Sequence, residues 1–204
     1  MIKLKRHLIQ RIRAAAGPMP NSDPHQLPLP ENTCNLQEEN IVFKHNRIYR
    51  HNILRINYTT YDVRRAQDTI NTNTSKRDIL VLSCEADSNS VMPFLYARVL
   101  GIFHVNAIHI GGSSPDYNPV RFDFLWVRWF KTLSPGSWEK HELERVAFPP
   151  MADEEAFGFL DPSSVVRACH LTPSFVQGPR YSDGQGLSTC ARDSDDYCQY
   201  FVGR

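Results

Sequence analysis

The fold of this chain is decided by four segments between residues 46 and 130, which read RIYRHNILRINYTTYDVRR (47–65), RDILVLS (77–83), FLYARVLGIFHV (94–105) and RFDFLWVRWF (121–130). Each segment is rich in β-branched and aromatic residues, and each is bounded by clusters of Asn, Asp, Ser, Gly or Pro. Such segments are typical of strands separated by turns. We therefore expect a mainly β fold, and nothing in or around the segments forms a convincing catalytic constellation.

The strand boundaries follow from alternation and from turn residues. A short strand over 41–44 is expected to meet a longer one over 47–61 at a turn formed by His45-Asn46, since Asn favours turns. The polar stretch 62–78 is expected to form turns rather than regular structure. Further strands are expected at 79–82, 94–105, 122–130 and 145–148. Both faces of 122–130 are largely apolar, which predicts a central strand.

The two ends of the chain differ in composition from this β-rich part. Apolar residues at helical spacing, with basic residues on the remaining face, predict an amphipathic basic helix within residues 1–16. Five prolines between Pro18 and Pro30 predict an extended linker over 17–40. We expect one β-barrel-like domain over 41–176, followed by a truncated C-terminal extension over 177–204.

The composition argues against several classes of protein. A formal net charge of +1 gives no electrostatic reason to expect nucleic-acid binding by the chain as a whole. No apolar run approaches the roughly 20 residues that a membrane-spanning helix needs, so no membrane partner is expected. The five cysteines are widely spaced and contain no CxxC pair, and no secretion signal precedes them. Reduced thiols in a soluble intracellular protein are therefore expected.

Five strings of this sequence are idiosyncratic enough to indicate a family. They are NRIYRHNILRINYTTYDVRRAQDTIN (46–71), YARVLGIFHVN (96–106), FDFLWVRWF (122–130), AFGFLDPSSVVRACHLTPSF (156–175) and LSTCARDSDD (187–196). Together they resemble the C-terminal region of fungal transposon-encoded proteins, of the kind that accompany Plavaka-type transposases in mushrooms. The similarity runs from about Lys3 to the end and is weakest in the Pro-rich linker. Family members usually continue past this point, so the resemblance implies a fragment or a degenerate copy.

The resemblance implies a nuclear protein, or alternatively a cytoplasmic one, that lies beside a transposase without being its nuclease. A transposase subunit is accordingly one expected partner. The acidic residues of this chain match no catalytic carboxylate pattern of the family, and no catalytic residue is assigned. These acidic residues include Asp116, Asp123, Asp153, Glu154 and Glu155.

The order of the segments also resembles bromo-adjacent homology modules, which elaborate a small SH3-like barrel. In those modules a Tyr-containing strand precedes a strand with a Trp-Phe pair, and a Cys-containing strand closes the domain. Here Tyr96–Ile102, Val127–Phe130 and Val165–Leu171 hold the corresponding places. The likeness implies a mainly β, SH3-like barrel with a short N-terminal helix and peripheral loops. An analogy of fold does not by itself supply a function.

Reactive sites find little support in the sequence. Cys169 and His170 with Cys190 and Cys198 offer the ligand types of structural zinc. Their spacing is irregular, however, which favours Cys169 as a small apolar residue of a strand. A nucleophilic Cys–His–Asp set is equally weak, because neither a GxSxG elbow nor a cysteine signature is present. We expect no metal, no cofactor and no small-molecule substrate.

Two kinds of binding surface are candidates. Aromatic side chains can form a cage for a methylated lysine, although most of those available here are expected in the core; the candidates are Tyr96, Trp126, Trp129 and Trp138. Basic side chains around the first long strand can contact phosphates, the alternative being a solvated strand face. These basic residues are Arg47, Arg50, Arg55, Arg64, Arg65, Lys76 and Arg77.

The sequence thus predicts a non-catalytic interaction module of a transposon-derived protein, which binds a protein, chromatin or DNA partner. One alternative is a structural part of a transposase with no ligand of its own. A second alternative is an uncharacterised enzyme. DNA binding predicts salt-sensitive complexes that weaken when Arg64 and Arg65 are removed, whereas a scaffold predicts none.

Overall fold

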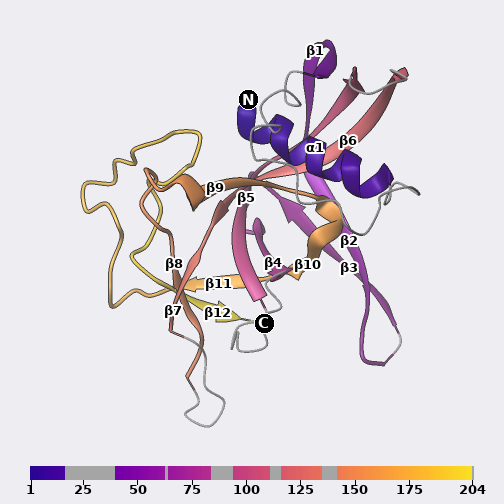
Figure 1. Ribbon diagram of the computed structural model, residues 1–204. Helices are drawn as coiled ribbons and strands as arrows, with labels where there is room; N and C mark the ends of the chain where they lie inside the picture. Colours follow the sequence, from indigo (N-terminus) through magenta and orange to yellow (C-terminus); the bar gives the residue numbers. More distant parts are fainter. Residues whose placement is uncertain (17–39, 63, 84–93, 111–115, 135–141, 204) are drawn as a thin grey trace, which may run out of the picture. The chain divides into compact units, whose positions relative to one another are not determined.

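The computed structural model describes residues 1–16, 40–62, 64–83, 94–110, 116–134 and 142–203 (Figure 1). The described chain is mainly β, with one helix at its N-terminus and open sheets. This confirms the coarse expectation, while the SH3-like barrel stays a prediction. The expected linker lies outside the described residues except for Asn40, and Trp138 lies outside them as well.

The chain forms two compact units. The first contains Met1–Arg50 and Phe103–Asp123, and the second contains His51–Ile102 and Phe124–Arg204. Both units therefore draw on the stretch 41–176 that the sequence suggested as one domain. The segment 177–204, expected as an extension, belongs to the second unit.

The first unit contains helix α1 (Ile2–Ala16), as the helical spacing of apolar residues predicts. Leu4, Leu8 and Ile9 are buried, because they lie along one stripe of the helix. Arg11 makes two further contacts from the helix. Its Nη1 donates to the backbone carbonyl of Asp123 at 2.6 Å, and its guanidinium lies 5.4 Å from the centre of the Phe122 ring. Both partners come from the first part of strand β6 (Asp116–Trp129).

Strand β1 (Ile41–His51) begins in the first unit and pairs with β5 (Phe94–His109). The expected turn at His45-Asn46 is not a turn. Both residues have positive φ, 58° and 51°, yet the strand continues through them. Asn and His tolerate this left-handed conformation better than most residues, so the pair distorts the strand without ending it. The strand ends at His51 instead, which divides the long strand expected over 47–61.

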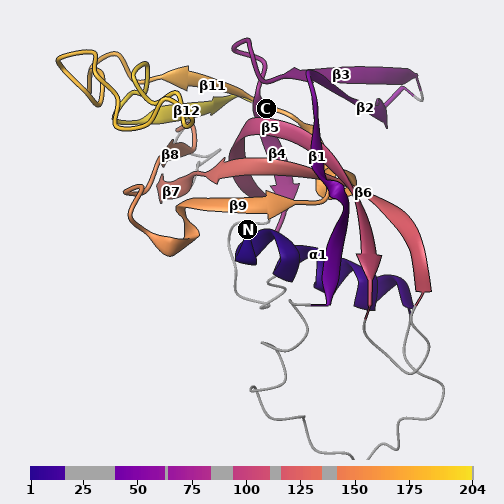
Figure 2. The same ribbon diagram turned by 90° about the horizontal axis from the view of Figure 1, so that it is seen from above.

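The second unit is organised by a sheet in which β10 (Val165–Ala168), β4 (Asp78–Leu82), β5, β6 and β9 (Phe157–Leu160) are hydrogen-bonded in that order. Figure 2 labels four of these strands, β4, β5, β6 and β9. Strand β6 lies between β5 and β9, which confirms the central position predicted from its two apolar faces. Its Leu125 and Val127 are fully buried with Ile79 and Val99 in one hydrophobic cluster. The burial of these side chains is the main favourable contribution to folding here.

A second sheet joins β11 (His170–Pro173), β12 (Tyr200–Gly203), β8 (Arg145–Ala147) and β7 (Lys131–Ser134) in that order. All four residues of β12 pair with β11, and two of them also pair with β8. Tyr200 and Val202 contribute to a core that also contains Phe130 and Phe148. The last residues of the chain are therefore part of the fold.

The remaining strands, β2 (Ile53–Thr59) and β3 (Arg65–Asn71), form a two-stranded antiparallel hairpin. The expectation that 62–78 is only turns is thus wrong for β3. Its polar residues, such as Gln67 and Thr69, occupy an exposed strand face, and pairing with β2 along its full length fixes the conformation. Two short 3₁₀ helices, Glu154–Ala156 and Pro162–Ser164, complete the unit. Among the described residues, no helix is long and apolar enough to cross a membrane.

Candidate nucleic-acid interface

The β2–β3 hairpin presents two different faces. On one face Leu54 and Ile56 pack against the main core of the second unit, to which β3 contributes the fully buried Ile70. The alternating burial of β2 shows the side-chain period of two that a half-buried strand requires. The opposite face is therefore held toward solvent along the whole length of the hairpin.

The exposed face carries cationic and neutral polar side chains, with the exposed Ile53 at the end of β2 away from the chain reversal. Cross-strand register places Arg55 opposite Thr69, Asn57 opposite Gln67 and Thr59 opposite Arg65. All six side chains are exposed, and Gln67 Nε2 donates to Asn57 Oδ1 at 2.7 Å. Among the described hairpin residues, no carboxylate lies on this face. We call these six residues the hairpin face.

The two carboxylates of the hairpin are engaged elsewhere. Asp68 lies on the core side, where its Oδ2 accepts hydrogen bonds from Arg167 Nε at 3.3 Å and from the backbone N–H of Ala168 at 3.0 Å. Arg167 also donates to the hydroxyl of Tyr58 at 2.8 Å. Asp62 lies beyond the end of β2 and pairs with Arg64 at 2.9 Å. Neither carboxylate therefore neutralises Arg55 or Arg65.

An open hollow of about 510 Å³ lies at the end of the hairpin nearest the chain reversal. Its described lining comes from both strands and consists of Asn57, Tyr58, Thr59, Arg65, Ala66 and Gln67. The lining combines a guanidinium, two amides, a hydroxyl and a phenol. These groups can donate hydrogen bonds to phosphate oxygens or to the edges of bases.

The other predicted basic residues are dispersed. Arg47 and Arg50 are exposed on β1 in the first unit. Lys76 is exposed between β3 and β4, whereas Arg77 is half-buried, and burial together with the charge of Arg98 lowers its pKa. Arg55, Arg64 and Arg65 therefore lie on one hairpin. The other four predicted basic residues lie outside it; they are Arg47, Arg50, Lys76 and Arg77.

The aromatic candidates do not form an exposed cage. Tyr96 is only 1% exposed, and its hydroxyl donates to Glu144 Oε2 at 2.7 Å inside the core. Trp126 is half-buried and stacks on Phe157 with ring centres 6.2 Å apart. Trp129 is half-buried and packs against the main core. A buried tyrosine cannot line a binding site on the surface, which corrects the inclusion of Tyr96.

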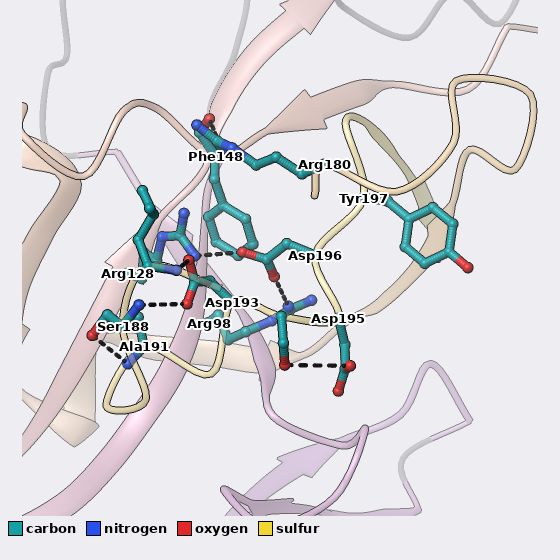
Figure 3. Close-up of polar contacts among 12 residues, drawn as sticks. Arg98, Arg128, Phe148, Arg180, Ser188, Ala191, Asp193, Asp195, Asp196 and Tyr197 are labelled. Carbon is teal, nitrogen blue, oxygen red and sulfur yellow. Dashed lines mark hydrogen bonds and ion pairs between the residues drawn. The ribbon is translucent and has the colours of Figure 1, made fainter. Parts of the chain in front are cut away.

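A buried ionic cluster of the second unit is absent from the sequence predictions. Arg98 Nε donates to Asp78 Oδ1 at 2.7 Å, and its Nη1 donates to Asp196 Oδ1 at 3.0 Å. Arg128 Nη1 donates to the other oxygen of Asp196 at 2.5 Å (Figure 3). Asp196 thus bridges two arginines from neighbouring strands, and it belongs to the C-terminal stretch of the chain. We call these four residues the arginine cluster.

Aromatic rings enclose the arginine cluster. The guanidinium carbon of Arg128 lies 3.9 Å from the centre of the Phe148 ring, and that of Arg98 lies 5.0 Å from the same ring. Cation–π attraction and charge-assisted hydrogen bonds act together here. Burial lowers the pKa of Arg98, but Asp78, Tyr200 and Asp196 together outweigh this effect and raise the pKa above its ordinary value, so Arg98 stays charged. All four residues of the arginine cluster are buried, so the cluster contributes to the core and presents no surface to a ligand.

The sequence did contain a signal for this cluster. Arg98 and Arg128 each interrupt an apolar run, in YARVLG and LWVRWF. A charged residue within a strand that is buried on both sides needs a buried partner of opposite charge. The partner Asp196 lies 68 residues from Arg128 in the chain, and no local pattern identifies it.

The cysteines do not assemble into a ligand set within the described chain. Cys190 and Cys198 are exposed, whereas Cys169 is half-buried. Burial raises the pKa of the Cys169 thiol, which disfavours the thiolate that both zinc binding and nucleophilic attack require. No described cysteine belongs to a group of three ligand atoms lying within 4.8 Å of one another.

The hairpin face is thus an exposed surface of the second unit on which cationic and neutral polar side chains are held together by strand pairing. Comparisons of the chain with protein-family models, with curated proteins and with solved structures found no match.

Proposed function

We propose that this protein is a non-catalytic interaction module that binds DNA through the exposed face of its β2–β3 hairpin. The observation that carries the proposal is the make-up of that face: two arginines, two amides and two threonines, with both hairpin carboxylates engaged away from it. DNA is a polyanion whose phosphates are contacted mainly by Arg, Lys and neutral donors of this kind.

The geometry of the hairpin supports the same proposal. The hairpin gathers arginine and amide side chains on one exposed face, where they can donate hydrogen bonds to phosphate oxygens and to base edges. Arg55 and Arg65 make no ion pair with any other described residue, so their charges are available to phosphates.

The wider biological setting is part of the proposal. The five strings that resemble fungal transposon-encoded proteins support a transposon-derived, nuclear module, and the order of its strands supports an SH3-like barrel. DNA is then the natural partner. Binding of a methylated lysine by an aromatic cage is a weaker candidate function, because Tyr96 is buried.

The test is fluorescence-anisotropy binding of the full chain to DNA over a salt titration. The wild type is expected to bind with an affinity that falls steeply with salt. The double change Arg55→Ala/Arg65→Ala is expected to weaken binding and to reduce the slope of log K against log salt by about two, because two phosphate contacts are lost.

The matched control is Lys131→Ala/Arg145→Ala, which removes the same charge from exposed positions of β7 and β8. This variant is expected to keep the wild-type slope. Equal losses in the two double variants would show a nonspecific effect of net charge. Absence of binding at low salt would refute the proposal and favour a protein partner or a scaffold.

A further inference from the structure

Tyr61 stands out at the end of the hairpin. Its relative exposure is 105%, more than that of any other large hydrophobic residue in the described chain. For comparison, the exposed Tyr117 of the first unit reaches 66%. A ring that is fully exposed buries no apolar area against the described residues, although aromatic rings bury more apolar area than most side chains when a partner covers them.

The described residues that flank Tyr61 make hydrogen bonds and an ion pair with one another. The N–H of Thr60 donates to the carbonyl of Arg64 at 2.8 Å, and Arg64 forms its ion pair with Asp62. The hydroxyl of Thr60 lies within hydrogen-bond distance of both the Asp62 carboxylate and the Arg64 carbonyl, and it donates to one at a time. These contacts link Thr60, Asp62 and Arg64, the described residues on both sides of Tyr61, and the Tyr61 ring is presented to solvent.

The chemistry around Tyr61 points to one kind of ligand. Arg65 is exposed, makes no ion pair with another described residue and lines the open hollow of the hairpin, whereas the exposed Arg64 is paired with Asp62. An exposed aromatic ring next to cationic side chains is the arrangement that binds unpaired bases, because the ring stacks on the base while the cations contact the phosphates. In intact duplex DNA the faces of the bases are covered by their neighbours.

We propose that Tyr61 stacks on an unpaired base, and that the hairpin therefore prefers single-stranded DNA over duplex. This inference rests on the proposed function and adds the form of the nucleic acid to it. The hairpin face binds the phosphates, and Tyr61 supplies the discrimination between single strand and duplex.

The experiment compares the wild type with Tyr61→Ala and Tyr61→Phe on two probes, a single-stranded oligonucleotide and the blunt duplex of the same sequence. Tyr61→Ala is expected to lose roughly tenfold in affinity for the single strand, the loss typical of one stacked base. Its affinity for the duplex is expected to change less than about twofold, since stacking on a paired base is blocked. Tyr61→Phe retains the ring and is expected to bind both probes as the wild type does.

A fluorescent base analogue, 2-aminopurine, placed within the single strand reports stacking directly. Its emission is expected to be quenched by the wild type and by Tyr61→Phe, but not by Tyr61→Ala at saturating protein. The control is Tyr117→Ala, which removes another exposed tyrosine and is expected to leave affinity and quenching unchanged.

The outcomes separate this inference from the proposed function. If Tyr61→Ala leaves single-strand affinity unchanged while the two hairpin arginines still matter, only the inference fails. A larger loss on duplex than on single strand also overturns it, in favour of a wedge inserted between base pairs. If the wild type binds neither probe in a salt-dependent manner, both proposals fail.

Discussion

The second unit uses arginine in two opposite ways, on the hairpin face and in the arginine cluster. Arg55 and Arg65 are exposed on the hairpin and make no ion pair with another described residue. Arg98 and Arg128 are 7% and 0% exposed, and both donate to Asp196. The same side chain is thus exposed to a partner in one place and buried against carboxylates and aromatic rings in the other, where Nε and Nη2 of Arg128 have no hydrogen-bond partner among the described residues.

This difference has a physical cause. A guanidinium in water is well solvated and keeps its capacity to bind phosphate, whereas a buried one has exchanged that solvation for carboxylates and aromatic rings. Burial raises the pKa of Asp196, and the two guanidiniums offset this only in part. The arginine cluster is therefore costly to assemble and far more costly to break, because a lost partner leaves a charge buried alone.

The largest effect is expected from Asp196→Ala. This change removes the carboxylate shared by Arg98 and Arg128, and it should lower the free energy of unfolding by about 3–5 kcal/mol. Urea titration measures the effect. The neighbouring Asp195→Ala changes an exposed carboxylate and should stay within about 0.5 kcal/mol of the wild type. If the two variants were equally stable, the arginine cluster would have no structural importance.

A smaller loss is expected from Tyr96→Phe. The change deletes the hydroxyl that donates to the buried carboxylate of Glu144, and hydrogen bonds to charged groups contribute about 1.5–3 kcal/mol. Thermal and urea unfolding should both register the loss. Tyr117→Phe, at an exposed site, serves as the control and should leave stability as it is. If Tyr96→Phe were as stable as the wild type, Glu144 would have to accept a hydrogen bond from another donor in the variant.

Acid should weaken the fold through Asp193. Burial raises the pKa of this carboxyl, but hydrogen bonds from the backbone N–H groups of Ser188 and Leu187 outweigh burial, so its pKa lies below the ordinary value. The stabilisation is therefore fully present above the unfolded value of about 3.9 and is lost as the pH falls through the folded pKa. The free energy of unfolding, measured at descending pH, should fall less steeply in Asp193→Asn than in the wild type. Parallel curves would contradict this assignment.

The sequence predicts some of these features better than others. The central position of β6 follows from apolar residues on both of its faces, and α1 follows from helical spacing, since local patterns determine both. Strand β3 was missed because its exposed polar residues resemble those of a loop, and its pairing with β2 is not visible in composition. Asp196 was missed because its partners are distant in the chain. Tyr96 was kept as a candidate for an aromatic cage, with most of the candidates expected in the core, because its bond to the buried Glu144 is not visible in the sequence.

The candidate site shows the same limit. Arg55, Arg64 and Arg65 were identified from charge, but the sequence did not separate them from Arg77, which is half-buried beside Arg98. Charge patterns indicate which residues are basic, and only tertiary packing decides which of them face solvent. The exposure of Tyr61 likewise follows from the hairpin geometry and from no feature of its local sequence.

The smallest change in the free energy of unfolding is expected for Arg55→Ala/Arg65→Ala, the same double variant that is expected to weaken DNA binding. Arg55→Ala/Arg65→Ala removes two exposed guanidiniums, and exposed substitutions usually change stability by less than about 0.5 kcal/mol. Urea unfolding of this variant should therefore overlay that of the wild type, while its DNA affinity falls and becomes less sensitive to salt. A fold that depended on these arginines would lose stability together with binding, and the loss of binding would then say nothing about contact with DNA. Stability that is retained while binding is lost would place the two arginines at the interface, because a residue that serves only the fold cannot separate the two measurements.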